Sequence, residues 1–244
     1  MQKFIGKMAR MYPLLIAMGF MIVAIALVVG YLNSQTASEY FSQTKVVRET
    51  TLTAQRAAIE STGLWLPYFK FLGIGLLLGG IVMALRVILD SLKAVGSSVL
   101  EGLPPDQRPT PPGPPWYGLL MPVVMMLGVA VLIVALIVSL GLAGTARAVF
   151  AHPVPEIDAA GAGSALLAQL QTIQTTSAWL VPFKFLGVAT EFLAIVMGLA
   201  TILFVLGAQT EMLEKGIQIG LAAKAAAGRS GDHAPVRQVG GVRT

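Results

Sequence analysis

Four long apolar runs constrain the fold of this chain more than any other feature of its sequence. They cover about residues 13–31, 65–89, 116–142 and 179–206. As a helix rising 1.5 Å per residue, each run crosses roughly 30 Å of hydrocarbon. A strand would leave backbone polar groups unpaired in lipid, so helices are the suitable structure. The sequence therefore predicts an all-α integral membrane protein with four transmembrane helices.

Composition supports this fold class. Charged residues make up 12% of the chain and its mean hydropathy is +0.76, whereas soluble domains carry about 25% charged residues. The net charge of +5 does not indicate nucleic acid, because the basic residues flank the apolar runs. The first run is longer than the roughly 7–15 apolar residues of a signal peptide, so it is predicted to be a retained helix. The absence of cysteine excludes disulfides, thiolate nucleophiles and cysteine-ligated metals.

An internal repeat relates the second run to the fourth. Residues 65–73 match residues 179–187 at an offset of 114, sharing a Trp and a Phe-Lys-Phe-Leu-Gly block. A small-Ile-Val-Met-small block, 80–84 and 194–198, follows at the same offset. The first and third runs align more weakly at an offset of 109, through Pro13, Gly19, Ala26 and Leu27 with Pro122, Gly128, Ala135 and Leu136. These matches predict two tandem parallel helix–loop–helix repeats that enter the membrane in the same direction.

The repeat divides the chain into segments. The predicted segments are a first repeat (1–103, with outer loop 32–64), a proline-rich linker (104–115), a second repeat (116–225, with outer loop 144–178) and a disordered tail (226–244). The linker is expected to be an extended spacer. The outer loops contain good helix formers with few breakers, so they are expected to hold helices that extend the spans or lie on the membrane surface.

The distribution of basic residues predicts the orientation. Of the 17 Lys and Arg residues, 11 lie near the two termini and the central linker, and the other 6 lie near the outer loops. By the positive-inside rule, the N-terminus, the C-terminus and the linker are cytoplasmic. The chain is accordingly predicted to be a multi-pass protein of the inner (plasma) membrane.

Glu191 is the main candidate for a functional residue. It lies about twelve residues inside Trp179, close to the middle of the fourth run, and its repeat equivalent is Leu77. An ionisable group at that depth costs at least a few kcal/mol, so it should face protein or water. One hypothesis is a proton or cation site. The alternatives are a protonated glutamate bonded to a neighbouring helix, or a buried contact with a partner subunit.

Three basic residues also lie within the predicted spans. Lys70 and Lys184 are repeat equivalents near the outer ends, and their long stems are expected to reach the outer surface. Lys184 stands seven residues before Glu191 on the same helical face, about 10 Å away. Direct pairing would be stretched, and a water or another subunit could bridge the two groups. Arg86 lies near the other end of the second span.

Small residues recur at four-residue spacing in the second and fourth spans. Gly75 and Gly79 form a GxxxG motif, and the pairs Gly80/Ala84 and Ala194/Gly198 are aligned by the repeat. Such faces allow helix backbones to approach closely. The pattern predicts packing of the second span against the fourth, either within the chain or between chains.

A metal site is only weakly indicated. His152, Glu156 and Asp158 lie together in the second outer loop, and Pro153 and Pro155 argue against a regular helix there. Two or three ligands are too few for a closed site, so neither a metal nor another cofactor is expected.

No motif points to catalysis by this chain. The spans contain no Walker loop, nucleotide fingerprint or histidine pair for haem. The leading hypothesis is a non-catalytic accessory or structural subunit of a multi-subunit membrane complex, acting through helix–helix packing. Its partners would be the lipid bilayer and other membrane subunits, in a hetero- or homo-oligomer. The alternative is a small oligomeric transporter or channel that uses Glu191; a subunit supplying a few ligands to a membrane enzyme is a third possibility.

Overall fold

The computed structural model describes residues 11–101, 113 and 115–231, and all of its regular secondary structure is helical. The helices are α2 (Tyr12–Ser42), α3 (Lys45–Thr50), α4 (Thr53–Glu101), α5 (Trp116–Phe150), α6 (Val154–Asp158) and α7 (Ala165–Gly231). Four of them, α2, α4, α5 and α7, are long and apolar enough to cross a membrane. The prediction of an all-helical chain with four helices able to span a bilayer is confirmed.

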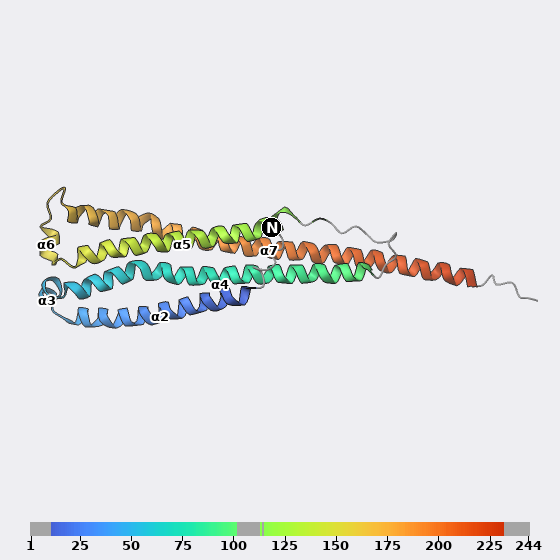
Figure 1. Ribbon diagram of the computed structural model, residues 1–244, viewed down its shortest axis with the longest axis horizontal. Coiled ribbons are helices and arrows are strands. Elements are labelled where there is room, and N and C mark those ends of the chain that lie inside the picture. The colour runs from blue at the N-terminus through green and yellow to red at the C-terminus, as the bar shows by residue number, and fades with distance from the viewer. Residues whose placement is uncertain (1–10, 102–112, 114, 232–244) are drawn as a thin grey trace, which may run out of the picture.

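The long helices form two hairpins that lie side by side (Figure 1). Helices α2 and α4 make the first hairpin and α5 and α7 the second, with the short helices α3 and α6 in contact at the same end. Helix α4 packs against α2, α5 and α7, whereas α2 packs mainly on α4. Most of α2 is consequently exposed, and only Gly19, Ala26 and Tyr40 on it are buried.

Several helices are longer than a bilayer requires. Helix α4 has 49 residues and α7 has 67, which correspond to about 74 Å and about 100 Å at 1.5 Å per residue. At the α3–α6 end, α2 continues to Ser42 and α5 to Phe150, so much of both predicted outer loops is helical. The bundle therefore projects beyond its apolar runs.

The segment boundaries at the other end differ in part from the sequence prediction. Helix α7 continues to Gly231, into the segment 226–244 predicted to be disordered, because the alanines that precede Gly228 favour a helix. The remainder of that tail lies outside the described residues. So does the linker 104–115, apart from Gly113 and Pro115.

Glycines bring the two helices of each hairpin into close contact. A methyl group placed on Gly19 of α2 would lie 2.7 Å from the main-chain oxygen of Gly73 on α4. One placed on Gly128 of α5 would lie 3.0 Å from the main-chain oxygen of Gly187 on α7. Larger residues at these positions would force the backbones apart. In the internal repeat, Gly19 corresponds to Gly128 at the offset of 109, and Gly73 corresponds to Gly187 at the offset of 114.

Helices α4 and α7 also pack against each other. The rings of Phe71 and Phe185, which the offset of 114 aligns, meet edge to face with centroids 5.4 Å apart. Further along, Val82 and Met83 of α4 share a buried cluster with Ala194 of α7. The contact expected between the second and fourth spans is therefore made within one chain.

The small residues of α4 face several neighbouring helices rather than α7 alone. Gly75 and Gly79 face Leu132 and Met125 of α5, Gly80 faces Ile16 of α2, and Ala84 is half-buried. On α7, Gly198 contacts Met121 of α5 and Leu85 of α4. The GxxxG motif of α4 thus admits large side chains from α5, because a glycine face provides space for whichever helix lies opposite.

Candidate functional site

Glu191 of α7 is completely enclosed by the bundle, with an exposed fraction of 0%. A methyl group on Gly128 of α5 would lie 2.9 Å from its Oε1 atom, and one on Gly79 of α4 would lie 3.9 Å from its Oε2 atom. Helices α4, α5 and α7 of the same chain therefore surround the carboxyl group. Its burial requires no partner subunit.

The carboxyl group of Glu191 lacks hydrogen-bond partners. Both of its oxygens are buried and unpaired among the described residues. The main chain of Val129 faces the group without reaching hydrogen-bond geometry. A buried polar group without a partner carries its full desolvation cost, about 1–3 kcal/mol and more when charged.

Three other polar residues that are buried in the described part of the chain, Ser61, Ser139 and Thr201, have side chains that are satisfied locally. Ser139 donates to the main-chain oxygen of Leu136 at 2.8 Å, and Thr201 donates to that of Met197 at 2.7 Å. A hydroxyl can bond the preceding turn of its own helix in this way. An ionised carboxylate has only acceptors and finds no free N–H within a helix. Among these four buried polar residues only Glu191 has no partner, although single buried atoms of Arg48, Arg56, Arg86 and Ser177 are also unpaired among the described residues.

Leu77 occupies the corresponding place in the first hairpin. A methyl group on Gly19 would lie 2.9 Å from Cγ of Leu77, and one on Gly128 would lie 3.0 Å from Cγ of Glu191. Each side chain therefore packs against the glycine of the neighbouring helix. The first hairpin therefore fills this place with a hydrocarbon side chain.

Lys184 does not pair with Glu191. Its Nζ atom lies 5.0 Å from the ring centroid of Tyr68 and 4.8 Å from that of Phe71, both on α4. Attraction between the ammonium group and the ring faces stabilises this placement. Lys70, the aligned lysine, is exposed. The two lysines thus occupy different environments, because only Lys184 faces the aromatic side chains between the hairpins.

Arg86 and the weak metal candidates make local contacts. The Nε atom of Arg86 lies 3.5 Å from Oδ1 of Asp90, which is one turn further along α4. His152 lies just before the short helix α6, which contains Glu156 and Asp158. Its Nδ1 atom is 3.0 Å from Oε1 of Glu156. A single helical turn forms there despite the prolines, because Pro155 occupies its first turn, where no N–H is needed. Among the described residues, no three His, Asp or Glu side chains converge as metal ligands.

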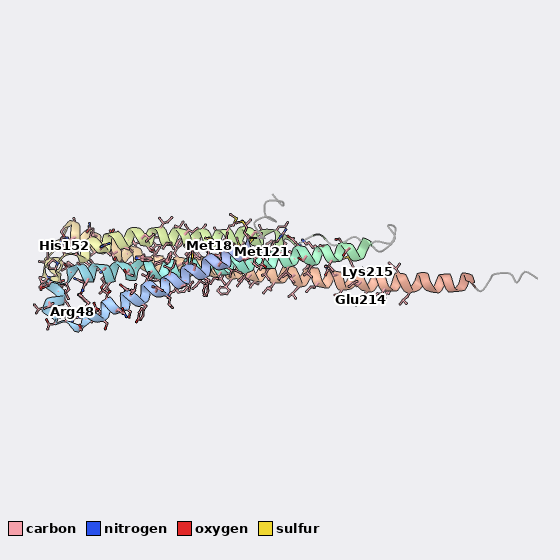
Figure 2. All side chains as sticks on the ribbon, turned by 60° about the horizontal axis from the view of Figure 1, so that its bottom comes forward. Met18, Arg48, Met121, His152, Glu214 and Lys215 are labelled. Carbon is pink, nitrogen blue, oxygen red and sulfur yellow. The ribbon has the colours of Figure 1, made fainter. Side chains whose placement is uncertain are left out.

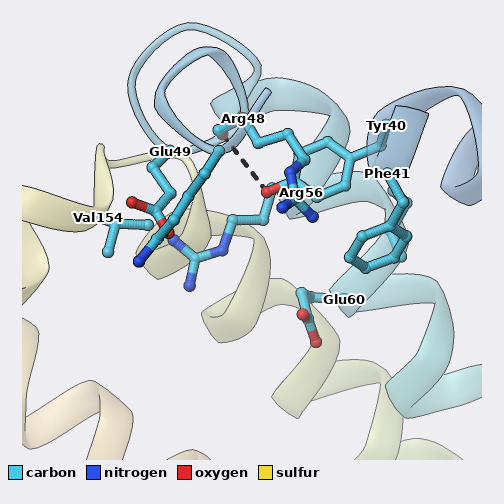
Figure 3. A pocket seen from close by; sticks show the side chains of 9 residues that line it. Tyr40, Phe41, Arg48, Glu49, Arg56, Glu60 and Val154 are labelled. Carbon is cyan, nitrogen blue, oxygen red and sulfur yellow. Dashed lines mark hydrogen bonds and ion pairs between the residues drawn. The ribbon is translucent and has the colours of Figure 1, made fainter. Parts of the chain in front are cut away.

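A charged pocket at the α3–α6 end was not predicted from the sequence. It has a volume of about 320 Å³ and is shown in Figure 3. Its charged lining residues are Lys45, Arg48, Glu49, Arg56 and Glu60. The sequence signal was the density of charge in the first outer loop, but its convergence depends on how α3 reverses the chain between α2 and α4.

No protein-family model, curated protein or solved structure matches this chain. The fold places the chain in the class of multi-pass membrane proteins. Its described residues form helices, and four of these are able to span a membrane.

Replacing Glu191 with leucine is expected to preserve or raise the stability of the protein. The substitution introduces the side chain that fills the equivalent place in the first hairpin and removes an unpaired buried polar group, with a gain of about 1–3 kcal/mol. Thermal unfolding in detergent, followed by circular dichroism, measures the effect.

The matched control is Leu77→Glu, which places a second unpaired carboxyl group in the first hairpin and should lower the melting temperature. A loss of stability in Glu191→Leu would mean that the carboxyl group makes a stabilising interaction after all.

Proposed function

We propose that this chain is a non-catalytic structural subunit of a multi-subunit membrane complex. The observation that carries the proposal is an apolar stripe on α7, beyond its apolar run. Helix α7 continues past the end of α4 at Glu101 (Figure 1), and Leu213, Ile217 and Leu221 are 49%, 62% and 64% exposed. Their four-residue spacing sets them on one face of the helix.

The polar residues around this stripe indicate an aqueous environment. Lys215 donates from Nζ to Oε1 of Glu211 at 2.7 Å, and this hydrogen bond lowers the pKa of the Glu211 carboxyl. Figure 2 labels Glu214 and Lys215 here, far from Arg48 and His152 at the opposite end. Exposed apolar side chains within the spans can contact lipid, whereas a stripe among charged residues outside them is suited to contact with a protein partner. An amphipathic helix of another subunit, or of a second copy, has the matching chemistry.

The tandem parallel repeat and the orientation form part of the same proposal. Two observations support the repeat. The Gly19–Gly73 contact of the first hairpin corresponds to the Gly128–Gly187 contact of the second, and Phe71 contacts Phe185, the residue with which it is aligned. The distribution of basic residues supports cytoplasmic termini and linker in the inner membrane. The α7 stripe would then project into the cytoplasm.

Cysteine labelling should report this orientation directly, because the chain contains no cysteine of its own. Neither Gly113 in the linker nor Gly161 between α6 and α7 has a neighbouring atom within 4 Å of the place where a Cβ would lie, so cysteine fits at both. A membrane-impermeant maleimide applied to intact cells should label Gly161→Cys and leave Gly113→Cys unlabelled until the cells are opened. Labelling of Gly113→Cys in intact cells would reverse the proposed topology.

The partner should depend on the α7 stripe. Purification of the tagged chain from its native membrane in a mild detergent is expected to recover a second polypeptide, or a second copy, in fixed stoichiometry. Leu213→Ser combined with Ile217→Ser should reduce its recovery by about tenfold or more, since burial of two large side chains is lost. Stoichiometry is measured by light scattering and quantitative mass spectrometry.

Gln218→Ser is the matched control, because Gln218 is exposed on the same turn but does not belong to the stripe. It should leave the recovery unchanged. A monodisperse monomer obtained under the mildest conditions would contradict the structural-subunit proposal.

A second candidate function is a small oligomeric transporter or channel that uses Glu191. The observation that favours it is the unpaired carboxyl group at mid-span, because ionisable residues at that depth commonly serve ion pathways. Four helices enclose little space, so several copies would be needed to form a pore. The proposal of a structural subunit requires no such pathway.

Ion flux into proteoliposomes separates the two candidate functions. A structural subunit should show no proton or potassium flux above that of protein-free vesicles. A transporter should show flux that Glu191→Gln reduces by at least about tenfold, as expected for loss of the ionisable group at that site. Equal flux in the variant and the parent protein would remove Glu191 from any transport mechanism.

A further inference from the structure

Two arginines from different helices converge at the charged pocket of the α3–α6 end (Figure 3). Arg48 comes from α3 and Arg56 from the first turns of α4, while Tyr40 and Phe41 at the end of α2 form part of the wall. Val154 of α6 also lines the pocket, so the second hairpin contributes to it. The pocket therefore depends on the docked arrangement of both hairpins.

Aromatic rings hold the two guanidinium groups in place. Cζ of Arg48 lies 5.3 Å from the ring centroid of Phe41 and 5.8 Å from that of Tyr40. Cζ of Arg56 lies 4.9 Å from the ring centroid of Phe150 on α5. Attraction between the cations and the ring faces favours these positions, and it uses none of the N–H groups as hydrogen-bond donors to an oxygen.

One nitrogen of each guanidinium group is enclosed and has no acceptor among the described residues. Nε of Arg48 and Nη1 of Arg56 are buried and make no hydrogen bond. The nearby acidic residues do not satisfy them: Glu49 lies 3.7 Å from Nζ of Lys45, and Glu60 forms no ion pair with either arginine among the described residues. Buried charged donors without partners are costly, which indicates that another group supplies the acceptor.

We propose that this pocket binds a phosphate group. A phosphate has several oxygens arranged tetrahedrally, so it can accept hydrogen bonds from two guanidinium groups that approach from different helices. Lys45 adds a third cation to the lining. The volume of about 320 Å³ accommodates a phosphate together with the polar group esterified to it. The source is either a phospholipid headgroup or a soluble phosphate, and this assignment does not depend on the proposed function.

The first experiment uses inorganic phosphate as the probe with the full chain in detergent. At constant ionic strength, phosphate should raise the melting temperature of the parent protein relative to chloride, because a ligand bound only by the folded state stabilises it. Arg48→Gln and Arg56→Gln should each weaken the apparent affinity by about tenfold or more. Arg147→Gln is the matched control, because Arg147 is exposed on α5 near the same end and does not line the pocket.

A second experiment identifies the source of the phosphate. Native mass spectrometry of protein extracted from native membranes should show phospholipid retained by the parent protein and by Arg147→Gln, and lost from Arg48→Gln and Arg56→Gln, if the ligand is a lipid. A melting shift with phosphate but no retained lipid would assign a soluble phosphate or phosphate ester. Both outcomes support the proposal that the pocket binds a phosphate group.

No melting shift and no retained lipid in the parent protein, or the same shift in all the variants, would overturn the proposal. If the glutamine variants do not fold, Arg48→Lys keeps the charge and the long stem but loses the planar fork. This variant should fold and bind phosphate more weakly than the parent, whereas unchanged binding would also overturn the proposal.

Discussion

Close contact between glycine backbones is the interaction on which the rest of this bundle depends. At the pairs Gly19–Gly73 and Gly128–Gly187, an added methyl group on one helix would lie 2.7 Å and 3.0 Å from the main-chain oxygen of the other. In a bilayer, van der Waals packing between helices supplies much of the association energy, and it is greatest where no side chains intervene. These contacts set the register of each hairpin. Because of that register, Leu77, one turn after Gly73, packs against Gly19. Glu191, one turn after Gly187, packs in the same way against Gly128.

The register explains why Glu191 is buried but not why the residue is a glutamate. Position 77 shows that a hydrocarbon side chain fits the same place, so packing alone does not select a carboxyl group. The hydroxyls of Ser139 and Thr201 are satisfied by their own helices, whereas the carboxyl of Glu191 is not. Its energetic cost is therefore not recovered by contacts within the described chain. A structural subunit tolerates such a group in its protonated form, while a transporter would use it.

Hydropathy was sufficient to predict the four long helices, because a bilayer requires about twenty apolar residues in each. The sequence also predicted that Glu191 faces protein or water rather than lipid, and the enclosed position of its side chain agrees with this. Other features depended on which face of a helix meets which neighbour. The partners of Gly75 and Gly79 on α5, and the different surroundings of Lys70 and Lys184, follow from the docking of the hairpins. Local sequence does not encode that docking.

The same docking gives the two ends of the molecule different chemistry. At the α3–α6 end, the first hairpin supplies the arginines and the second supplies Phe150, which stacks on Arg56, and Val154. Neither hairpin alone could form that pocket. At the opposite end, Gln209 of α7 donates to the main-chain oxygen of Leu92 on α4, so the two helices remain joined beyond their apolar runs.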